Sequence, residues 1–114
     1  MDIAVESQGD IAVVSLRGEY LIMTNVEDFK RDIAPVMETQ KRVVFDLSQL
    51  QFIDSSGLGA ILSCLRKLTA SGGDLKLCAL TPPVRELVEV TRMHRIFDIF
   101  DTSEEAIQSF GART

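Results

Sequence analysis

The sequence predicts an α/β domain with a mostly parallel sheet, and three observations lead to this fold class. Short apolar segments alternate with amphipathic ones, which gives the element order ββαβαβαβα. Residues 43–47 and 75–80 are apolar almost throughout, as is typical of parallel strands buried on both faces. Gly, Pro and Asp residues separate the segments at short intervals, so the connections are short. With 114 residues, the chain is expected to form one domain over positions 1–114.

The first two strands are expected to form an antiparallel hairpin. Residues 3–5 and 11–16 are rich in aliphatic side chains, and Gly9-Asp10 between them favours a tight turn. Residues 20–23, which follow the second strand, are unusually apolar for a connection.

The first helix is expected to begin near Thr24. Thr24 and Glu27 have the spacing of a capping box, and apolar residues recur behind them at helical intervals. Pro35 falls inside this pattern. Because proline lacks a backbone donor, we expect the helix to kink or divide there.

The second helix is predicted over residues 55–70, with Gly72-Gly73 after its end. One arc of this helix is apolar and carries Leu58, Ile61, Leu62, Leu65 and Leu68. The opposite arc is small or polar and carries Ser56, Gly59, Ala60, Ser63, Arg66 and Lys67. The exposed face near the start of the helix is therefore built of small residues.

The last third of the chain continues the alternation. Thr81 precedes a third helix with Pro82 at its first position, where the missing donor of proline costs nothing. Residues 96–100 are a short apolar strand. Thr102 and Glu105 then repeat the capping-box spacing and begin a final helix, which ends before Gly111.

Composition excludes several classes of function. The net charge of −5 and the scattered basic residues argue against a nucleic-acid partner. Cys64 and Cys78 have no metal-type spacing, so we expect free buried thiols, no metal and no cofactor. No apolar run approaches the ~20 residues that span a bilayer, and no signal peptide is visible at the start. We therefore expect a cytoplasmic protein with no membrane partner, and a monomer when free.

Two motifs lie where open α/β sheets place their binding sites, beyond the carboxyl ends of the strands. Asp46-Leu47-Ser48 ends a predicted strand, and Asp54-Ser55-Ser56-Gly57-Leu58-Gly59 begins the following helix. Together they resemble the signature of the anti-sigma factor antagonists, which are single-domain members of the STAS family. The resemblance covers nearly the whole chain, since it extends to Gly18-Glu19, the helix led by Pro82 and residues 101–106.

The resemblance implies a STAS-type domain that binds an anti-sigma factor and so releases a sigma factor. In the family, the anti-sigma factor is an ATP-dependent serine kinase that switches the antagonist off, and a phosphatase restores it. The acceptor is the serine directly after the aspartate, which corresponds to Ser55. A helix N-terminus favours negative charge, so a phosphate there is compatible with the fold. The expected partner-binding residues are Asp54, Ser55, Ser56, Gly57, Gly59, Ala60 and Ser63.

The chain departs from the family at one place. Members commonly carry an acidic or polar residue two positions after the Gly-Glu pair, where this sequence has Leu21. We expect the side chains of Tyr20, Leu21, Ile22 and Met23 to form an exposed apolar patch that enlarges the partner interface, with Leu21, Ile22 and Met23 as partner-binding residues. On this hypothesis, replacing Leu21 and Ile22 with Ser weakens binding and leaves the melting temperature nearly unchanged.

Other interpretations use the same residues. Ser55 would serve equally well as a helix N-cap, and Asp46 as an acceptor for the loop that follows it.

An enzyme would need Ser55 or Ser56 as nucleophile, His94 as base and Asp46 or Asp54 to orient it. The sequence has no G-x-S-x-G elbow and no P-loop, so we expect no enzyme. A STAS subunit of another complex, in lipid transport or a signalling scaffold, remains an alternative; a small-molecule sensor has no polar constellation to support it.

Overall fold

The computed structural model describes residues 1–111, and its elements follow the predicted order with three additions. The strands are β1 (Ile3–Gln8), β2 (Ile11–Leu16), β3 (Tyr20–Leu21), β4 (Arg42–Asp46), β5 (Phe52–Ile53), β6 (Asp74–Cys78) and β7 (Asp98–Phe100). The helices are α1 (Val26–Thr39), α2 (Ser55–Ala70), α3 (Pro82–Val90) and α4 (Ser103–Ser109), with a 3₁₀ helix, η1 (Met93–Arg95). The additions are β3, β5 and η1, which lie where the sequence predicts connections.

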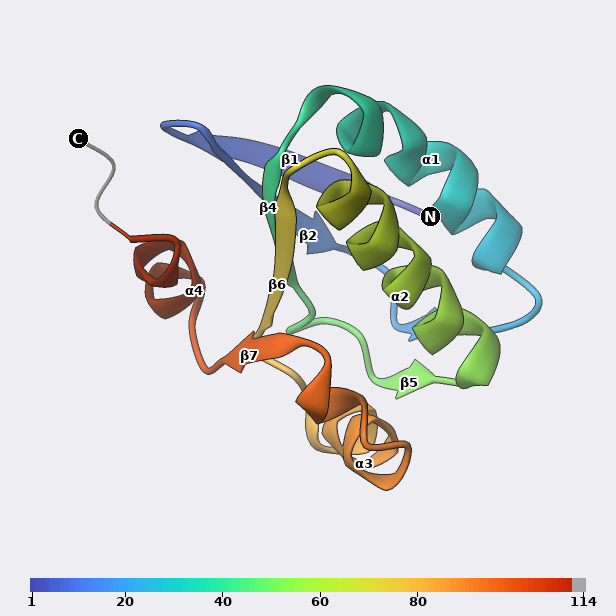
Figure 1. The fold of residues 1–114 in the computed structure, drawn as a ribbon. Helices are drawn as coiled ribbons and strands as arrows, with labels where there is room; N and C mark the ends of the chain where they lie inside the picture. Colours follow the sequence, from blue (N-terminus) through green and yellow to red (C-terminus); the bar gives the residue numbers. More distant parts are fainter. Residues whose placement is uncertain (112–114) are drawn as a thin grey trace.

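The main sheet has the strand order β1-β2-β4-β6-β7 (Figure 1). Strands β1 and β2 pair antiparallel, and the other neighbours pair parallel. The structure therefore confirms an α/β fold with a mostly parallel sheet and an antiparallel N-terminal hairpin.

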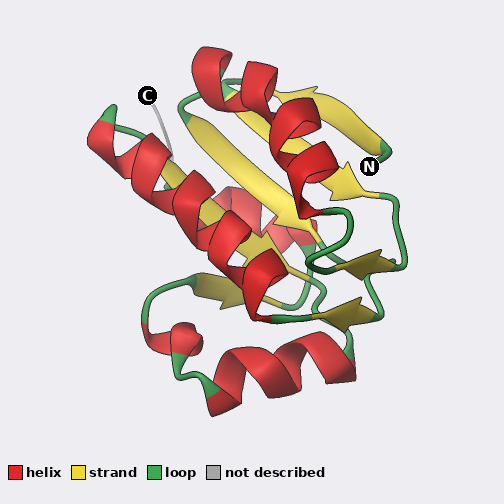
Figure 2. Ribbon diagram, turned by 90° about the vertical axis from the view of Figure 1, so that its right-hand side faces the viewer, coloured by secondary structure: helices red, strands yellow, loops and turns green. Residues whose placement is uncertain are grey.

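Helices cover both faces of this sheet, with α1 and α2 on one side and α4 on the other (Figures 1 and 2). Val43 and Phe45 of β4 join the larger core under α1 and α2, where Phe29 meets Phe45 edge to face at 6.2 Å. Val44, between them, packs with Ala106 of α4. Because successive side chains of a strand point to opposite faces, burial on both sides explains the continuous apolar run.

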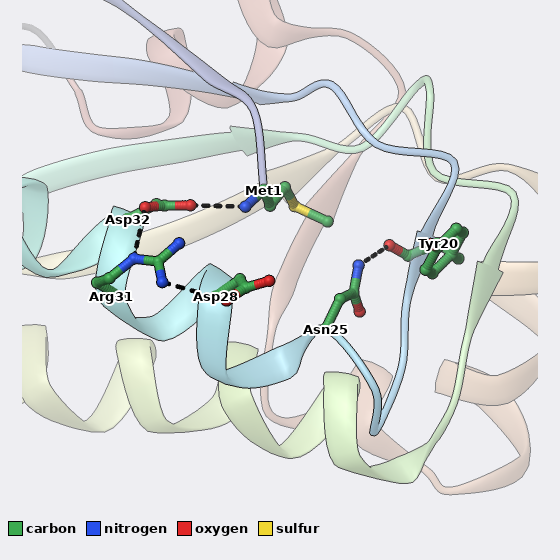
Figure 3. A network of polar contacts seen from close by, with 6 residues as sticks. All are labelled: Met1, Tyr20, Asn25, Asp28, Arg31 and Asp32. Atoms are coloured by element: carbon green, nitrogen blue, oxygen red, sulfur yellow. Dashed lines mark hydrogen bonds and ion pairs between the residues drawn. The ribbon is translucent and has the colours of Figure 1, made fainter.

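Helix α1 begins differently from the prediction, and the Thr24–Glu27 capping box is not formed. The N-cap is Asn25, whose side chain makes no capping bond. Its Oδ1 instead accepts a hydrogen bond from Ile22 N at 2.8 Å, and its Nδ2 donates to Tyr20 O at 2.9 Å (Figure 3). Asn25 thus fixes the turn before the helix, which moves the helix start one residue past the position that Thr24 would cap.

Helix α1 does not divide at Pro35 but runs unbroken to Thr39. Pro35 lies in the C-terminal part of the helix, and Val36 and Met37 beyond it are buried. We attribute the continuity to this burial, which offsets the single backbone hydrogen bond that proline removes.

Charged groups link α1 to the start of β1 (Figure 3). The amino group of Met1 lies 2.6 Å from Asp32 Oδ2, and Arg31 contacts Asp28 and Asp32, each at 3.2 Å. Hydrogen bonds from the Met1 amino group and from Arg31 lower the pKa of Asp32. These contacts join the first helix to the edge of the sheet.

Candidate functional site

Asp54 joins two loops at the N-terminus of α2. It is the N-cap, and its Oδ1 accepts a hydrogen bond from Gly57 N at 2.9 Å. Its Oδ2 accepts a second bond, also of 2.9 Å, from Met23 N in the loop before α1. Both N–H groups stabilise the charged form of Asp54 and so lower its pKa, and the N–H of Gly57 has the larger effect.

A second, two-stranded sheet brings these loops together beside α2 (Figure 2). Strands β3 and β5 pair parallel, with Tyr20 opposite Phe52 and Leu21 opposite Ile53. Just before β3, Glu19 O accepts bonds from Gln51 N at 2.7 Å and Phe52 N at 3.0 Å. The apolar connection after β2 and the loop before α2 are therefore one structural unit.

Gly57 allows α2 to approach this unit closely. A Cβ atom on Gly57 would lie 2.1 Å from the carbonyl oxygen of Leu21, so no other residue fits without movement of the backbone. Gly59 is different, because a Cβ there would have no neighbour within 4 Å. The sequence alone does not distinguish the roles of the two glycines. In the structure, Gly57 is buried against β3, whereas Gly59 exposes the backbone of α2 to solvent.

Ser55 is the first residue of α2, and its side chain is exposed. Because Asp54 caps the helix, the interpretation of Ser55 as the N-cap is wrong. Ser56 is half-buried, whereas Gly59 and Ser63 are exposed. Residues four apart lie on one face of a helix, so Ser55, Gly59 and Ser63 form a single exposed strip along α2, which we call the α2 strip.

The structure corrects the predicted apolar patch. Leu21 is 0% exposed and belongs to the core, and Ile22 is half-buried. Tyr20 is 47% exposed because it precedes Leu21 on β3 and so points to the opposite face, and Met23, in the turn that follows β3, is 71% exposed. Phe52 of β5, which the prediction did not include, is 64% exposed. The exposed apolar group at this end of the molecule is therefore Tyr20, Met23 and Phe52, which we call the apolar cluster.

Two other predicted partner residues are also buried. Gly57 is covered by the β3–β5 unit, and Ala60 is 3% exposed. The prediction that Gly57 contacts a partner directly is therefore wrong. Gly57 instead positions the start of α2 against β3. Ala60 instead lines a groove between α1 and α2.

Asp46 and His94, which were considered for catalysis, belong to different elements from Ser55 and Ser56. Asp46, at the end of β4, accepts a hydrogen bond from Ser48 N at 2.9 Å, as in the interpretation that makes it an acceptor for the following loop. His94 lies in η1, after α3, and is exposed. Within residues 1–111, no cluster of three His, Cys, Asp or Glu residues could hold a metal ion.

Both cysteines are free and buried, as predicted. Burial raises the pKa of Cys64 and of Cys78 to about 12. The thiolate that reacts or binds metal is therefore disfavoured at both positions. Across the described residues, no helix is long and apolar enough to cross a membrane.

Comparison with known proteins confirms the resemblance. Residues 2–106 match the STAS domain family. The chain is 31% identical over 108 residues to the anti-sigma F factor antagonist of Paenibacillus polymyxa, covering 94% of this chain and 92% of that protein. It is 27% identical over 103 residues to the anti-sigma-B factor antagonist of Bacillus subtilis, covering 90% and 93%.

Solved structures agree with this assignment. The anti-sigma factor antagonist SpoIIAA in its unphosphorylated form gives a TM-score of 0.76 at 26% identity and covers 96% of each chain. The Bacillus cell fate determinant SpoIIAA in its phosphorylated form gives 0.71 at 25% identity, covering 96% of this chain and 100% of that one. The two relatives above and SpoIIAA are named as anti-sigma factor antagonists or cell fate determinants, and the chain itself belongs to the STAS domain family.

Proposed function

We propose that this protein is an anti-sigma factor antagonist that phosphorylation of Ser55 switches off. Unphosphorylated, it binds an anti-sigma factor with serine kinase activity and so releases a sigma factor. The observation that carries the proposal is the exposed Ser55 side chain at the first position of α2, directly after Asp54. A relative that has been solved in both unphosphorylated and phosphorylated forms supports it.

The proposed binding surface combines the α2 strip with the apolar cluster. Gly59 offers backbone with no neighbouring side chain, so a partner can approach closely. Tyr20, Met23 and Phe52 supply exposed apolar area, which marks interaction surfaces when it is contiguous. Asp54 holds the two parts together through Met23 N and Gly57 N.

Phosphorylation would act on this surface without unfolding the domain. A phosphate adds about −1.5 to −2 charges at the N-terminus of α2, where the helix dipole and free N–H groups tolerate it. A partner covering the strip would then have to bury the added charge. An uncompensated buried charge costs several kcal/mol, and about 4 kcal/mol corresponds to roughly a thousandfold in affinity. Local electrostatics thus suffice for a switch.

The remaining parts of the proposal follow from this role. The protein is a binding module and not an enzyme, and a separate phosphatase removes the phosphate from Ser55. It acts in the cytoplasm, where the kinase has ATP, as a monomer when free. It binds neither nucleic acid nor membrane, in agreement with its net charge of −5.

The alternative is a STAS subunit of another complex without a sigma factor. It would share the fold and the α2 strip but would have no reason to bind a serine kinase. Binding to a kinase of the anti-sigma type therefore separates the two functions.

A mass measurement tests the proposal. The purified protein is incubated with ATP and, in turn, with each anti-sigma-type serine kinase of its source organism. The intact mass of the protein is then measured. We expect one added phosphate, lost in Ser55→Ala and retained in the matched control Ser56→Ala. A chain that gains no mass with any of these kinases, or that gains it equally in Ser55→Ala, contradicts Ser55 as the acceptor.

A further inference from the structure

A groove of about 180 Å³ lies between α1 and α2. Its apolar lining includes Ile33 and Met37 from α1 and Cys64 from α2, all three of which belong to the core. Apolar cavities of roughly 150 Å³ hold a benzene-sized group. The groove is therefore large enough for one apolar side chain, such as Leu, Met or Phe.

The groove is continuous with the α2 strip. Ser63, the last residue of the strip, also lines the groove. Ser63 Oγ donates to Gly59 O at 3.0 Å, so the two positions are adjacent on α2. A partner that covers Ser55 and Gly59 and follows the helix axis reaches the groove within the next turn.

Two lysines give the groove a positive rim on an otherwise acidic protein. Lys30 of α1 and Lys67 of α2 both line it, and both are exposed. No acidic residue is among the described residues that line the groove. Lys30 contacts Glu27 at 3.3 Å, but this pair is on the surface, where ion pairs contribute little and exchange partners readily.

We propose that this groove receives an apolar side chain of the anti-sigma factor, from a segment whose carboxylates pair with Lys30 and Lys67. The inference rests on the proposed function and adds to it the chemistry of the partner. The groove supplies a pocket for an apolar anchor residue of the partner. The lysines at the rim of the groove favour a partner sequence with acidic residues on either side of that anchor. The interface therefore extends from Ser55 along α2 to Lys67.

Two kinds of variant separate the apolar and the electrostatic parts. Ala34 lines the groove on α1, so Ala34→Leu fills it while keeping a strong helix former. Lys30→Glu and Lys67→Glu reverse the charge of the rim. Arg66→Glu is the matched control, because Arg66 is exposed on α2, next to Lys67, but does not line the groove.

Affinity is measured by titration against the kinase that binds the unmodified protein, at low and high salt. We expect Ala34→Leu to raise Kd about tenfold, mainly through faster dissociation. The combined lysine variant should also raise Kd about tenfold, by slowing association, and should weaken the salt dependence. Arg66→Glu should change Kd much less. Melting temperatures of all variants verify that the fold is kept.

The possible results distinguish this inference from the proposed function. In one result, the unmodified protein binds the kinase, Ser55→Glu weakens binding, and the groove variants bind as tightly as the unmodified protein. The groove inference is then wrong, and the proposed function stands. If the unmodified protein binds none of the kinases, the proposed function fails, and the groove has no such occupant. An effect of Arg66→Glu equal to that of the lysine variants would show a general charge effect and contradict a rim at Lys30 and Lys67.

Discussion

At the scale of single residues, the site depends on one carboxylate and two glycines. Asp54 accepts bonds from two backbone N–H groups that come from different loops, and Gly57 allows the Leu21 carbonyl to lie against α2. Motif spacing predicted the importance of these positions. It could not predict the division of roles between Gly57 and Gly59, because that depends on which face of α2 meets β3.

The two glycines give a matched pair of variants. Gly57→Ala should lower the free energy of unfolding by about 1–3 kcal/mol or more, because the new Cβ would lie 2.1 Å from Leu21 O. Gly59→Ala should raise it by roughly 0.8–1 kcal/mol, since alanine is the better helix former and the space is open. Urea unfolding of both variants checks this. A Gly57→Ala protein as stable as the parent would contradict the close approach of α2 and β3.

The charge of Asp54 should make the site sensitive to acid. Backbone hydrogen bonds lower its pKa in the folded state, so the stabilisation is fully present above the unfolded pKa of about 3.9. It is lost as the pH falls below that value, through the lower pKa of the folded state. The difference in unfolding free energy between the parent and Asp54→Asn should therefore shrink from about pH 6 to about pH 2. A difference that stays constant or grows would contradict the role of the carboxylate.

At the scale of elements, periodicity predicted the long segments and missed the short ones. Helix α2 has the predicted limits, residues 55–70, because sixteen residues display several turns of an apolar stripe. Strands β3 and β5 have two residues each, too few to show an alternation. Their pairing also depends on contacts between segments about thirty positions apart, which no local pattern encodes. For this reason the sequence pattern predicts neither the burial of Leu21 nor the exposure of Phe52 beside Tyr20.

Strand β3 and the turn after it therefore supply a test of buried against exposed apolar residues. Leu21→Ser should lower the free energy of unfolding by about 2–5 kcal/mol, as expected for truncation of a core leucine. Met23→Ser, two residues later and exposed, should change it by no more than about 0.5 kcal/mol but should weaken binding of the kinase. Thermal unfolding and titration of the two variants check both parts. Equal stability losses would contradict the burial of Leu21 and the exposure of Met23.

At the scale of the whole molecule, the sheet holds the α2 strip and the apolar cluster in fixed positions. The α/β class, the parallel sheet and the hairpin were predictable, because buried strands and amphipathic helices leave clear patterns. The groove between α1 and α2 was not predictable, since it arises from how two helices pack. Its lysines are ordinary surface residues in the sequence, and only the packing of α1 against α2 brings Lys30 and Lys67 to the lining of one groove.

The fold should also remain unchanged when the site is charged. Ser55 is exposed at the start of a sixteen-residue helix, so Ser55→Glu introduces a negative charge where the helix dipole favours it. We expect its melting temperature to equal that of the parent or exceed it slightly. Near-UV circular dichroism on both proteins checks the tertiary packing, and a loss of that signal in Ser55→Glu would contradict a purely local switch.

The most direct test of the central claim compares the unmodified and Ser55-phosphorylated proteins in a titration against the same anti-sigma kinase. The melting temperature of each sample is recorded alongside. The account predicts that the phosphorylated form keeps its fold but binds on the order of a thousandfold more weakly, because the partner must bury the phosphate. Equal affinities of the two folded forms would contradict it.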